Sequence, residues 1–200
     1  RISSIALLAA ALVGVPLGYV VGTRQFKGHA LVGTALNTFV SLPTVIVGLF
    51  LFTFLSRQGP LGSLNLLFTV KAVIIGQFIL ATPIVAALTM SAVHEVDARI
   101  KPTAQTLGAS PLFAAWTVLQ EARYGLMAAI VAGFGRAIAE VGSAIMLGGN
   151  IRGYTRTVTT AIALETSKGE YGMAIALGII LLMVAFTVNI FFRKFQARAV

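Results

Sequence analysis

The chain has 200 residues, of which 58% are hydrophobic and 10% are charged, and its mean hydropathy is +0.93. Soluble globular domains carry about 25% charged residues, so this composition argues against a soluble protein. The absence of cysteine excludes disulfides, thiolate metal sites and cysteine nucleophiles. In a membrane protein, the formal net charge of +9 indicates basic cytoplasmic loops before it indicates a nucleic-acid partner.

Long apolar runs occupy most of the chain and predict an all-α transmembrane protein, a helical bundle of about five spans. About 18 or more consecutive apolar residues are enough to cross a bilayer as a helix. The runs cover residues 2–21, 30–55, 72–93, 124–147 and 171–192. Because the chain starts at Arg1 and enters a span at once, we expect a further N-terminal helix before it.

Two ridges of small residues predict close helix packing. Residues four apart share a helix face, and small side chains let helices approach each other closely in lipid. The ridges consist of Ala6, Ala10, Gly14, Gly18 and Gly22 in the first run, and of Gly125, Ala129 and Gly133 in the fourth. Prolines 16, 43 and 83 also fall inside runs, where they act either as packing kinks or as hinges of a moving bundle.

Two opposite charges lie inside the fourth run. Arg136 and Glu140 are four residues apart, so they share one face of a helix. Charges inside a membrane are costly and usually face the bundle interior in pairs. Two roles fit this pair: a self-neutralised contact that fixes the helix, or a gate along a polar pathway.

The loops differ in their basic content if the spans alternate across the membrane. One side carries Arg24, Lys27, Arg99, Lys101, Arg123, Arg193, Lys194 and Arg198. The other side carries Arg57, Lys71, Arg152, Arg156 and Lys168. Since basic residues concentrate in cytoplasmic loops, residues 94–123 are expected to be cytoplasmic and the loop around Arg152 to lie outside.

A polar elbow, residues 97–113, interrupts the apolar sequence. Pro102 suits the first position of a helix, and Gly108 suits a left-handed helix stop. Ser110 followed by Pro111 suits the start of a second helix. The sequence therefore predicts two short helices joined by a glycine turn, which form a rigid protrusion that a cytoplasmic partner could push or pull.

The elbow resembles the cytoplasmic EAA loop of type I ABC importer permeases, whose pattern is E-A-A, three residues, G, nine residues, I-x-L-P. At the matching positions stand Pro102, Thr103 and Ala104, then Gly108, Val118, Gln120 and Glu121. Nearly the whole chain resembles the permeases of tungstate importers, most closely over residues 133–182, and more loosely those of molybdate and sulfate importers. The stretches SRQGPLG at 56–62 and QEARYG at 120–125 fit the same group.

The resemblance implies one permease domain over residues 1–200, with residues 94–123 as its coupling loop. It implies a multi-pass subunit of the cytoplasmic (inner) membrane of a prokaryote. A homodimer would work with an ABC ATPase dimer, which binds ATP and magnesium, and with an extracytoplasmic oxyanion-binding protein. This chain would need only the lipid bilayer, and neither a cofactor nor nucleic acid.

The resemblance also implies which residues contact the ATPase: Lys101, Pro102, Thr103, Ala104, Gln105, Gly108 and Ala109. Because Pro102 stands where the family often has glutamate, that charged contact is lost, and Lys101 and Gln105 are candidates to replace it. In the outer loop, Asn150, Arg152 and Arg156 are candidates to attract a dianion toward a pore mouth. Contact with lipid headgroups or with acidic patches on the binding protein is an equal alternative.

No phosphate-loop pattern occurs, neither His29 nor His94 has a partner at ligand spacing, and neither Ser110 nor Ser143 has a histidine or lysine base nearby in the sequence. The sequence therefore predicts a transporter subunit that is not an enzyme and carries no metal. The alternatives are a stand-alone secondary transporter or channel for a small anion, which would need an internal repeat and a coupling-ion site, and a membrane scaffold. Nothing in the spans separates tungstate from molybdate or sulfate.

Overall fold

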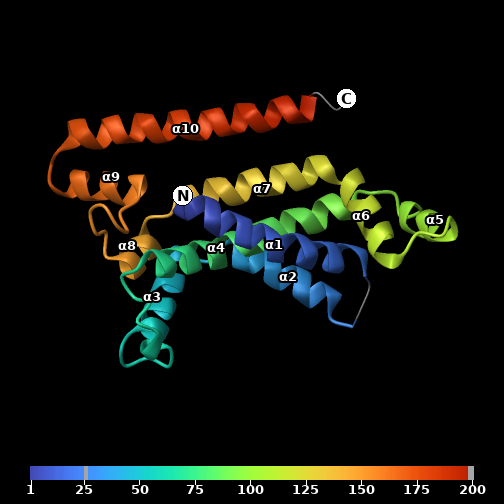
Figure 1. Ribbon diagram of the computed structural model, residues 1–200, viewed down its shortest axis with the longest axis horizontal. Helices are drawn as coiled ribbons and strands as arrows, with labels where there is room; N and C mark the ends of the chain where they lie inside the picture. The colour runs from blue at the N-terminus through green and yellow to red at the C-terminus, as the bar shows by residue number, and fades with distance from the viewer. Residues whose placement is uncertain (25–26, 198–200) are drawn as a thin grey trace.

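The computed structural model describes residues 1–24 and 27–197, and all of their regular structure is helical (Figure 1). The α-helices are α1 (Ile2–Thr23), α2 (His29–Val40), α3 (Thr44–Leu55), α4 (Val70–His94), α5 (Ile100–Thr106), α6 (Pro111–Glu121), α7 (Arg123–Ile138), α8 (Gly142–Gly148), α9 (Val158–Ser167) and α10 (Tyr171–Ala197). A 3-10 turn, η1 (Gly62–Leu64), lies between α3 and α4. Arg198, one of the basic residues expected on the cytoplasmic side, lies outside the described residues.

Three helices, α1, α4 and α10, are long and apolar enough to cross a membrane. The second and fourth predicted spans are broken rather than continuous. The axes of α2 and α3 meet at 96°, and those of α7 and α8 at 58°. If each bent pair is counted as one span, the described residues form up to five spans, the number predicted.

Pro43 accounts for the break between α2 and α3. It has no backbone N–H to donate, and its ring disfavours a helical backbone at the preceding residue, Leu42. Its own backbone is extended (φ −62°, ψ 124°), and α3 begins at the next residue. Pro16 and Pro83, in contrast, lie inside α1 and α4, which continue past them.

The ridge of small residues on α1 packs against α4, as predicted. Ala10 is 0% exposed. A Cβ added at Gly14 would lie 3.0 Å from the Cβ of Val85, and one added at Gly22 would lie 3.0 Å from the Met90 carbonyl oxygen. Because the contacts advance along both helices together, α1 and α4 run parallel.

The second ridge packs α7 against the same helix in the opposite direction. A Cβ added at Gly125 would strike Ala92, and one added at Gly133 would lie 2.7 Å from a methyl of Val85. Ala129, between these glycines, is 0% exposed. Helix α4 therefore lies at the centre of a core made with α1 and α7 (Figure 1).

Helix α4 also separates the two polar ends of the molecule. Its last residue, His94, leads toward α5 and α6 (Figure 1). Near its start, a Cβ added at Gly76 would lie 2.6 Å from a methyl of Leu147 in α8. With 25 residues, α4 spans about 37 Å between these ends.

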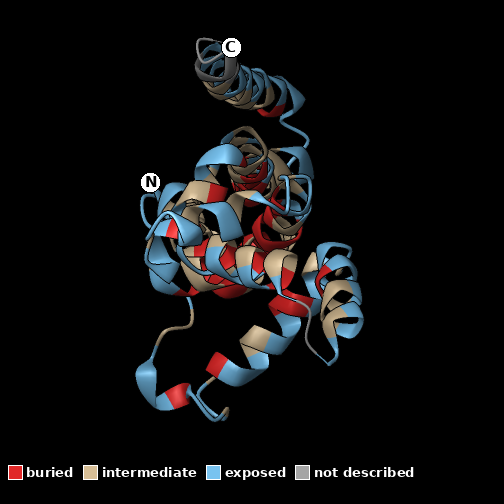
Figure 2. Cartoon of the chain, turned by 90° about the vertical axis from the view of Figure 1, so that its right-hand side faces the viewer, coloured by how far each residue is buried: buried red, intermediate tan, exposed pale blue. Residues whose placement is uncertain are grey.

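Helix α10 stands apart from this core. It packs against α9 and to a smaller extent against α7. Figure 2 shows that most of its surface is exposed, and its exposed residues include Leu182, Phe186 and Phe191. Such a helix has an apolar face that must be covered by lipid or by another chain, because water would not solvate it favourably.

Gly18 is the most constrained position in the α1–α4 contact. A Cβ there would strike the Ala86 carbonyl oxygen and lie 2.7 Å from the Cβ of Thr89. Because that oxygen belongs to the backbone of a buried helix, we expect Gly18→Ala to lower the free energy of unfolding by about 1–3 kcal/mol, despite alanine's better helix propensity. Thermal unfolding of the detergent-purified protein measures the change.

Gly178→Ala is the matched control. Gly178 is also helical, in α10, and no atom lies within 4 Å of a Cβ added there. We expect its unfolding temperature to stay the same or rise slightly, because alanine favours the helix. Equal stability of the two variants would contradict the close contact between α1 and α4.

Candidate functional site

The elbow at one end of the bundle consists of α5 and α6 (Figure 1). Helix α5 ends in a Schellman motif, in which the Gly108 N–H donates to the Gln105 carbonyl and the Ala109 N–H donates to the Ala104 carbonyl, each at 3.0 Å. Gly108 has a φ of +89°, which confirms the predicted left-handed stop. This motif fixes the angle between the two helices through backbone bonds alone.

Helix α6 begins as predicted. Pro111 is its first residue, and the Ser110 hydroxyl accepts the Phe113 N–H at 3.2 Å. Helix α5 begins two residues earlier than predicted, so Pro102 is its third residue rather than its first. The first four N–H groups of a helix have no partner within the helix, so Pro102 still costs no hydrogen bond.

Asp97 and Arg99 contact each other just before α5 begins. The Asp97 carboxylate accepts the Arg99 backbone N–H at 2.9 Å and lies 2.7 Å from its guanidinium. These hydrogen bonds from Arg99 lower the pKa of Asp97 to about 2. The carboxylate therefore stays ionised at neutral pH and is already occupied by one cation.

The elbow is apolar at its tip and anchored at its base. Leu107 and Leu112 are each 83% exposed. At the base, Val118 and Val93 belong to one buried cluster, against which Ile100 packs. The elbow thus projects apolar side chains from a fixed base, which is the form expected of a docking element.

The residues expected to contact an ATPase differ in their orientation. Pro102, Thr103, Gln105 and Gly108 are exposed, whereas Ala104 and Ala109 are partly buried. Lys101 is also partly buried, and its ammonium lies 5.7 Å from the centre of the Tyr19 ring on α1. This cation–π contact directs Lys101 toward the bundle rather than away from it.

Glu140 lies in the break between α7 and α8. Its side chain is 1% exposed, and its Oε2 accepts a hydrogen bond from Arg136 Nη1 at 3.0 Å. Its Oε1 accepts the Ser143 N–H at 2.8 Å. The Thr159 hydroxyl donates to the Glu140 backbone carbonyl at 2.9 Å. One residue thus joins α7, α8 and α9.

These contacts support the first of the two roles considered for the charged pair. A buried carboxylate is stable only when both oxygens have partners. Arg136 supplies one partner, and the break in the helix supplies the other by freeing the Ser143 N–H from an intrahelical bond. A role of Arg136 and Glu140 in gating a pathway stays a prediction.

Sequence reasoning missed the buried polar residues near this break. Ser143 is 0% exposed and Gln77 1% exposed, and each has a side-chain oxygen without a hydrogen-bond partner among the described residues. Glycines flank Ser143: a Cβ at Gly48 would lie 2.9 Å from its Cα, and one at Gly76 3.5 Å from its Oγ. Neither serine nor glutamine follows a motif here, so the sequence offered no signal for them.

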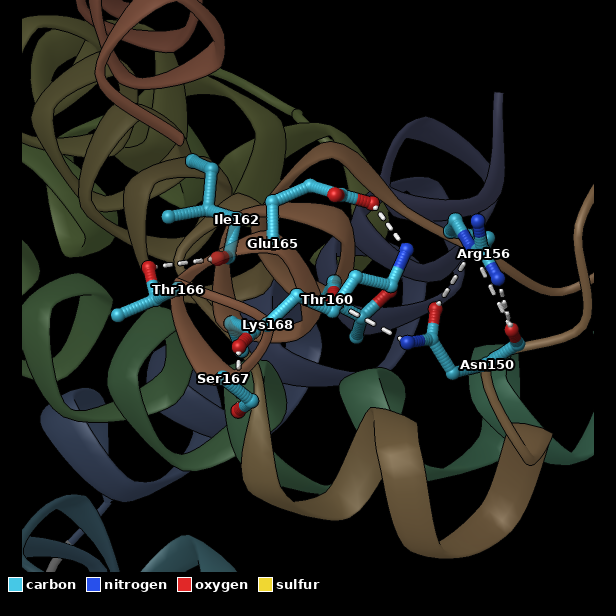
Figure 3. Close-up of polar contacts among 9 residues, drawn as sticks. Asn150, Arg156, Thr160, Ile162, Glu165, Thr166, Ser167 and Lys168 are labelled. Carbon is cyan, nitrogen blue, oxygen red and sulfur yellow. Dashed lines mark hydrogen bonds and ion pairs between the residues drawn. The ribbon is translucent and has the colours of Figure 1, made fainter. Parts of the chain in front are cut away.

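The loop between α8 and α9 is held by its own polar groups (Figure 3). Arg156 Nε donates to Asn150 Oδ1 at 3.1 Å, and its Nη2 donates to the Asn150 carbonyl at 3.1 Å. The Asn150 amide donates in turn to the Thr160 carbonyl at 3.2 Å. Arg152 is exposed. Asn150 and Arg156 therefore shape the loop, while Arg152 faces outward, and their attraction of an anion stays a prediction.

The structure separates the elbow from the other two predicted sets of residues. The elbow lies beyond the C-terminal end of α4, and Asn150 lies near its N-terminal end, where α8 packs. The charged pair lies on α7 and the break that follows, at the Asn150 end: Thr159 donates to the Glu140 carbonyl, and the carbonyl of the next residue, Thr160, accepts from Asn150. Among residues 1–24 and 27–197, no three histidine, aspartate or glutamate side chains gather closely enough to hold a metal ion.

The contact between Arg136 and Glu140 leads to a specific prediction about stability. Arg136→Ala leaves the buried carboxylate without its counter-charge, and we expect a loss of about 3–5 kcal/mol. Adding Glu140→Gln removes the charge and keeps an oxygen for the Ser143 N–H. The double variant should therefore unfold at a higher temperature than Arg136→Ala alone, which a double-mutant cycle on thermal unfolding will measure.

The exposed pair of Lys168 and Glu165 is the control for this cycle. Its charged atoms lie 2.9 Å apart, but the lysine side chain is 50% exposed. Its coupling should not exceed about 1 kcal/mol. Additive effects at Arg136 and Glu140, with no recovery in the double variant, would show that the two residues do not neutralise each other.

Comparisons with known proteins place this geometry in a family. Residues 14–200 match the family model of the binding-protein-dependent transport system inner membrane component. The chain is 41% identical over 202 residues to a probable anion ABC transporter permease of Haloferax volcanii, covering 98% of this chain and 87% of that protein. It is 43% identical over 188 residues to the tungstate uptake system permease TupB of Peptoclostridium acidaminophilum, covering 94% and 82%.

More distant relatives share the fold. The molybdenum transport system permease ModB of Escherichia coli is 27% identical, over 92% of this chain and 88% of that protein. A chain of the MetNI methionine ABC transporter in an inward-facing conformation superposes with a TM-score of 0.76 at 16% identity, covering 100% of this chain and 91% of that chain. The chain therefore belongs to the family of binding-protein-dependent transport system inner membrane components and has the fold of ABC transporter permeases.

Proposed function

We propose that this chain is the membrane-spanning subunit of an ATP-driven importer that moves an oxyanion, tungstate first, into the cell by alternating access. The family match and the fold support the assignment to this class of importer. The observation that carries the mechanism is the elbow, a rigid protrusion with exposed apolar residues on a base fixed to the core. The substrate rests on relatives above 40% identity, among them one named for anions and two for tungstate uptake.

The relatives rank the candidate oxyanions. Identity to the tungstate permease is 43%, against 27% to the molybdenum permease and 29% to a probable sulfate permease of Nephroselmis olivacea. The exposed Arg152 adds a fork of donors outside the bundle, which suits a tetrahedral oxyanion. We infer that tungstate is the preferred oxyanion, and the identities do not separate molybdate from sulfate.

The elbow would act as the coupling helix. Its tip, with Leu107 and Leu112, fits an apolar groove on a cytoplasmic ATPase. Because Lys101 lies over the Tyr19 ring, Gln105 is the better candidate for the polar contact that glutamate makes elsewhere in the family. Movement of the ATPase would reach α4 and α7 through the buried base at Val118.

The remaining partners and the location follow from this assignment. Two copies of the permease would pair, and two ATPase subunits would bind ATP and magnesium and hydrolyse ATP. A binding protein outside the membrane would select and deliver the oxyanion. We place the subunit in the cytoplasmic membrane of a prokaryote, with residues 1–200 as one domain and residues 94–123 on the cytoplasmic side. A stand-alone transporter or channel would leave the exposed apolar elbow without a role.

Uptake into proteoliposomes tests the proposal. They should contain the permease with the ATPase and binding protein of the same organism, and internal tungsten, molybdenum and sulfur are measured by mass spectrometry. We expect tungsten uptake that requires ATP and the binding protein and that equimolar molybdate or sulfate reduces only weakly. Uptake without ATP would favour the stand-alone transporter, and ATP-driven uptake of sulfate alone would overturn the substrate.

The turn at Gly108 provides variants for the same assay. No atom lies within 4 Å of a Cβ added there, so a larger residue is opposed only by the φ of +89°. Gly108→Val should abolish the stimulation of ATPase activity by loaded binding protein, because β-branched residues avoid this backbone region. Gly108→Asn should retain most of it, because asparagine tolerates a left-handed backbone.

Gly169→Val is the control at a different turn. Gly169 also has a positive φ, +80°, and open space around it, but it lies between α9 and α10. We expect this variant to keep the ATPase stimulation. Full stimulation in Gly108→Val, with a normally assembled complex, would mean that the elbow does not transmit the signal.

A further inference from the structure

A cavity of about 630 Å³ lies beside the elbow. Its walls come from the last turn of α1, the start of α2, the end of α4 and the loop that enters α5. The proposed transport mechanism does not use this cavity. The cavity is large enough for a small ion, and it lies where Lys101 of α5 faces residues of α1 and α2.

The cavity is lined by more positive than negative charge. Arg24 follows α1, and Lys101 belongs to α5, so two cations face the same space from different elements. Asp97 is the acid among the described lining residues, and its carboxylate is already held 2.7 Å from the Arg99 guanidinium. The cations of the cavity therefore have no competing free carboxylate.

Two further contacts fix the shape of the site. His29 Nε2 lies 2.7 Å from the Val21 carbonyl oxygen, so the ring is held against the last turn of α1. Because a carbonyl only accepts, the ring must carry its hydrogen on Nε2. The Lys101 ammonium is held over the Tyr19 ring at 5.7 Å. Both groups are thus placed before any ligand arrives, which reduces the cost of binding.

We propose that this cavity binds a tetrahedral oxyanion between Arg24 and Lys101. Guanidinium and ammonium groups recognise sulfate-like and phosphate groups through charge-assisted hydrogen bonds. The oxyanion is either a free ion from the cytoplasm or the phosphate of an anionic lipid, whose chains could follow the apolar part of the wall. Because Lys101 is part of α5, a bound oxyanion would also tie the elbow to α1.

Binding to the full chain in nanodiscs of phosphatidylcholine tests the site, and it does not depend on which solute is imported. Sodium tungstate and sodium sulfate are titrated by calorimetry. In parallel, protein purified from membranes that contain phosphatidylglycerol is assayed for retained lipid by mass spectrometry. We expect at least one of these ligands to bind, and the double variant Arg24→Gln/Lys101→Gln to weaken that binding at least about tenfold.

Two variants keep the outcome decisive. Ala98, which also lines the cavity, is exposed, so Ala98→Trp should fill the space and weaken binding without removing a charge. Lys194→Gln removes an exposed cation from the end of α10 and should leave binding unchanged.

The two ligand arms then identify the source of the oxyanion. If free ions bind the parent chain and the cavity variants lose this binding, the site takes an ion from the cytoplasm. If the parent chain retains phosphatidylglycerol and the same variants do not, the site takes the phosphate of a lipid. The proposal is overturned if neither ligand binds, or if binding persists equally in the cavity variants. Tungstate uptake could fail entirely without affecting either result.

Discussion

The close approach of α1 and α7 to α4 is the contact on which the rest of the structure depends. In lipid, helices gain little from burying apolar surface, since the solvent is equally apolar, and association relies on packing. Glycine and alanine make that packing tight: a Cβ at Gly18 or at Gly125 would strike an atom of α4. Both polar ends of the molecule are attached to this packed core, so their separation is set by the length of α4.

A rigid core suits a protein that transmits motion. The base of the elbow is buried with Val93 at the end of α4, while α8 packs near the start of the same helix. A displacement of the elbow therefore cannot be absorbed by loose side chains and must move whole helices. Under the proposed function, this coupling of two ends through packed helices would carry alternating access.

The breaks in the helices place polar groups where a continuous helix could not. A straight helix would use the Ser143 N–H internally, leaving the Glu140 carboxylate with one partner fewer. The bend of 58° frees that N–H and lets α9 reach the Glu140 carbonyl through Thr159. The polar groups of the break thus satisfy one another, which lowers the cost of keeping an acid inside the bundle.

Local signals in the sequence were enough to predict much of this arrangement. The four-residue spacing of Gly14, Gly18 and Gly22 predicted the packed face, and the turn chemistry of Gly108 and Ser110 predicted the elbow. These features depend on backbone conformation and helix periodicity, which neighbouring residues determine. The same reasoning set the start of α5 two residues late, because it could not see the Asp97–Arg99 contact that begins the helix.

Features made by residues distant in the chain were not predictable in the same way. The contact between Thr159 and the Glu140 carbonyl spans 19 residues, and no periodic pattern relates the two. The sequence also did not show that the Arg156 guanidinium donates to Asn150 and holds the loop. Hydropathy likewise joined α7 to α8, because an apolar bend and an apolar span have the same composition.

The central claim is that the packed core holds the elbow on the cytoplasmic side and the loop after α8 on the opposite side. Since the chain has no cysteine, single cysteines can be placed at Gln105 and at Arg152, both of which are exposed. Labelling with a membrane-impermeant thiol reagent, in intact cells and in inverted vesicles, measures the side of each. The account predicts labelling of Gln105→Cys only in inverted vesicles and of Arg152→Cys only in intact cells. Labelling of both from the same side would contradict it.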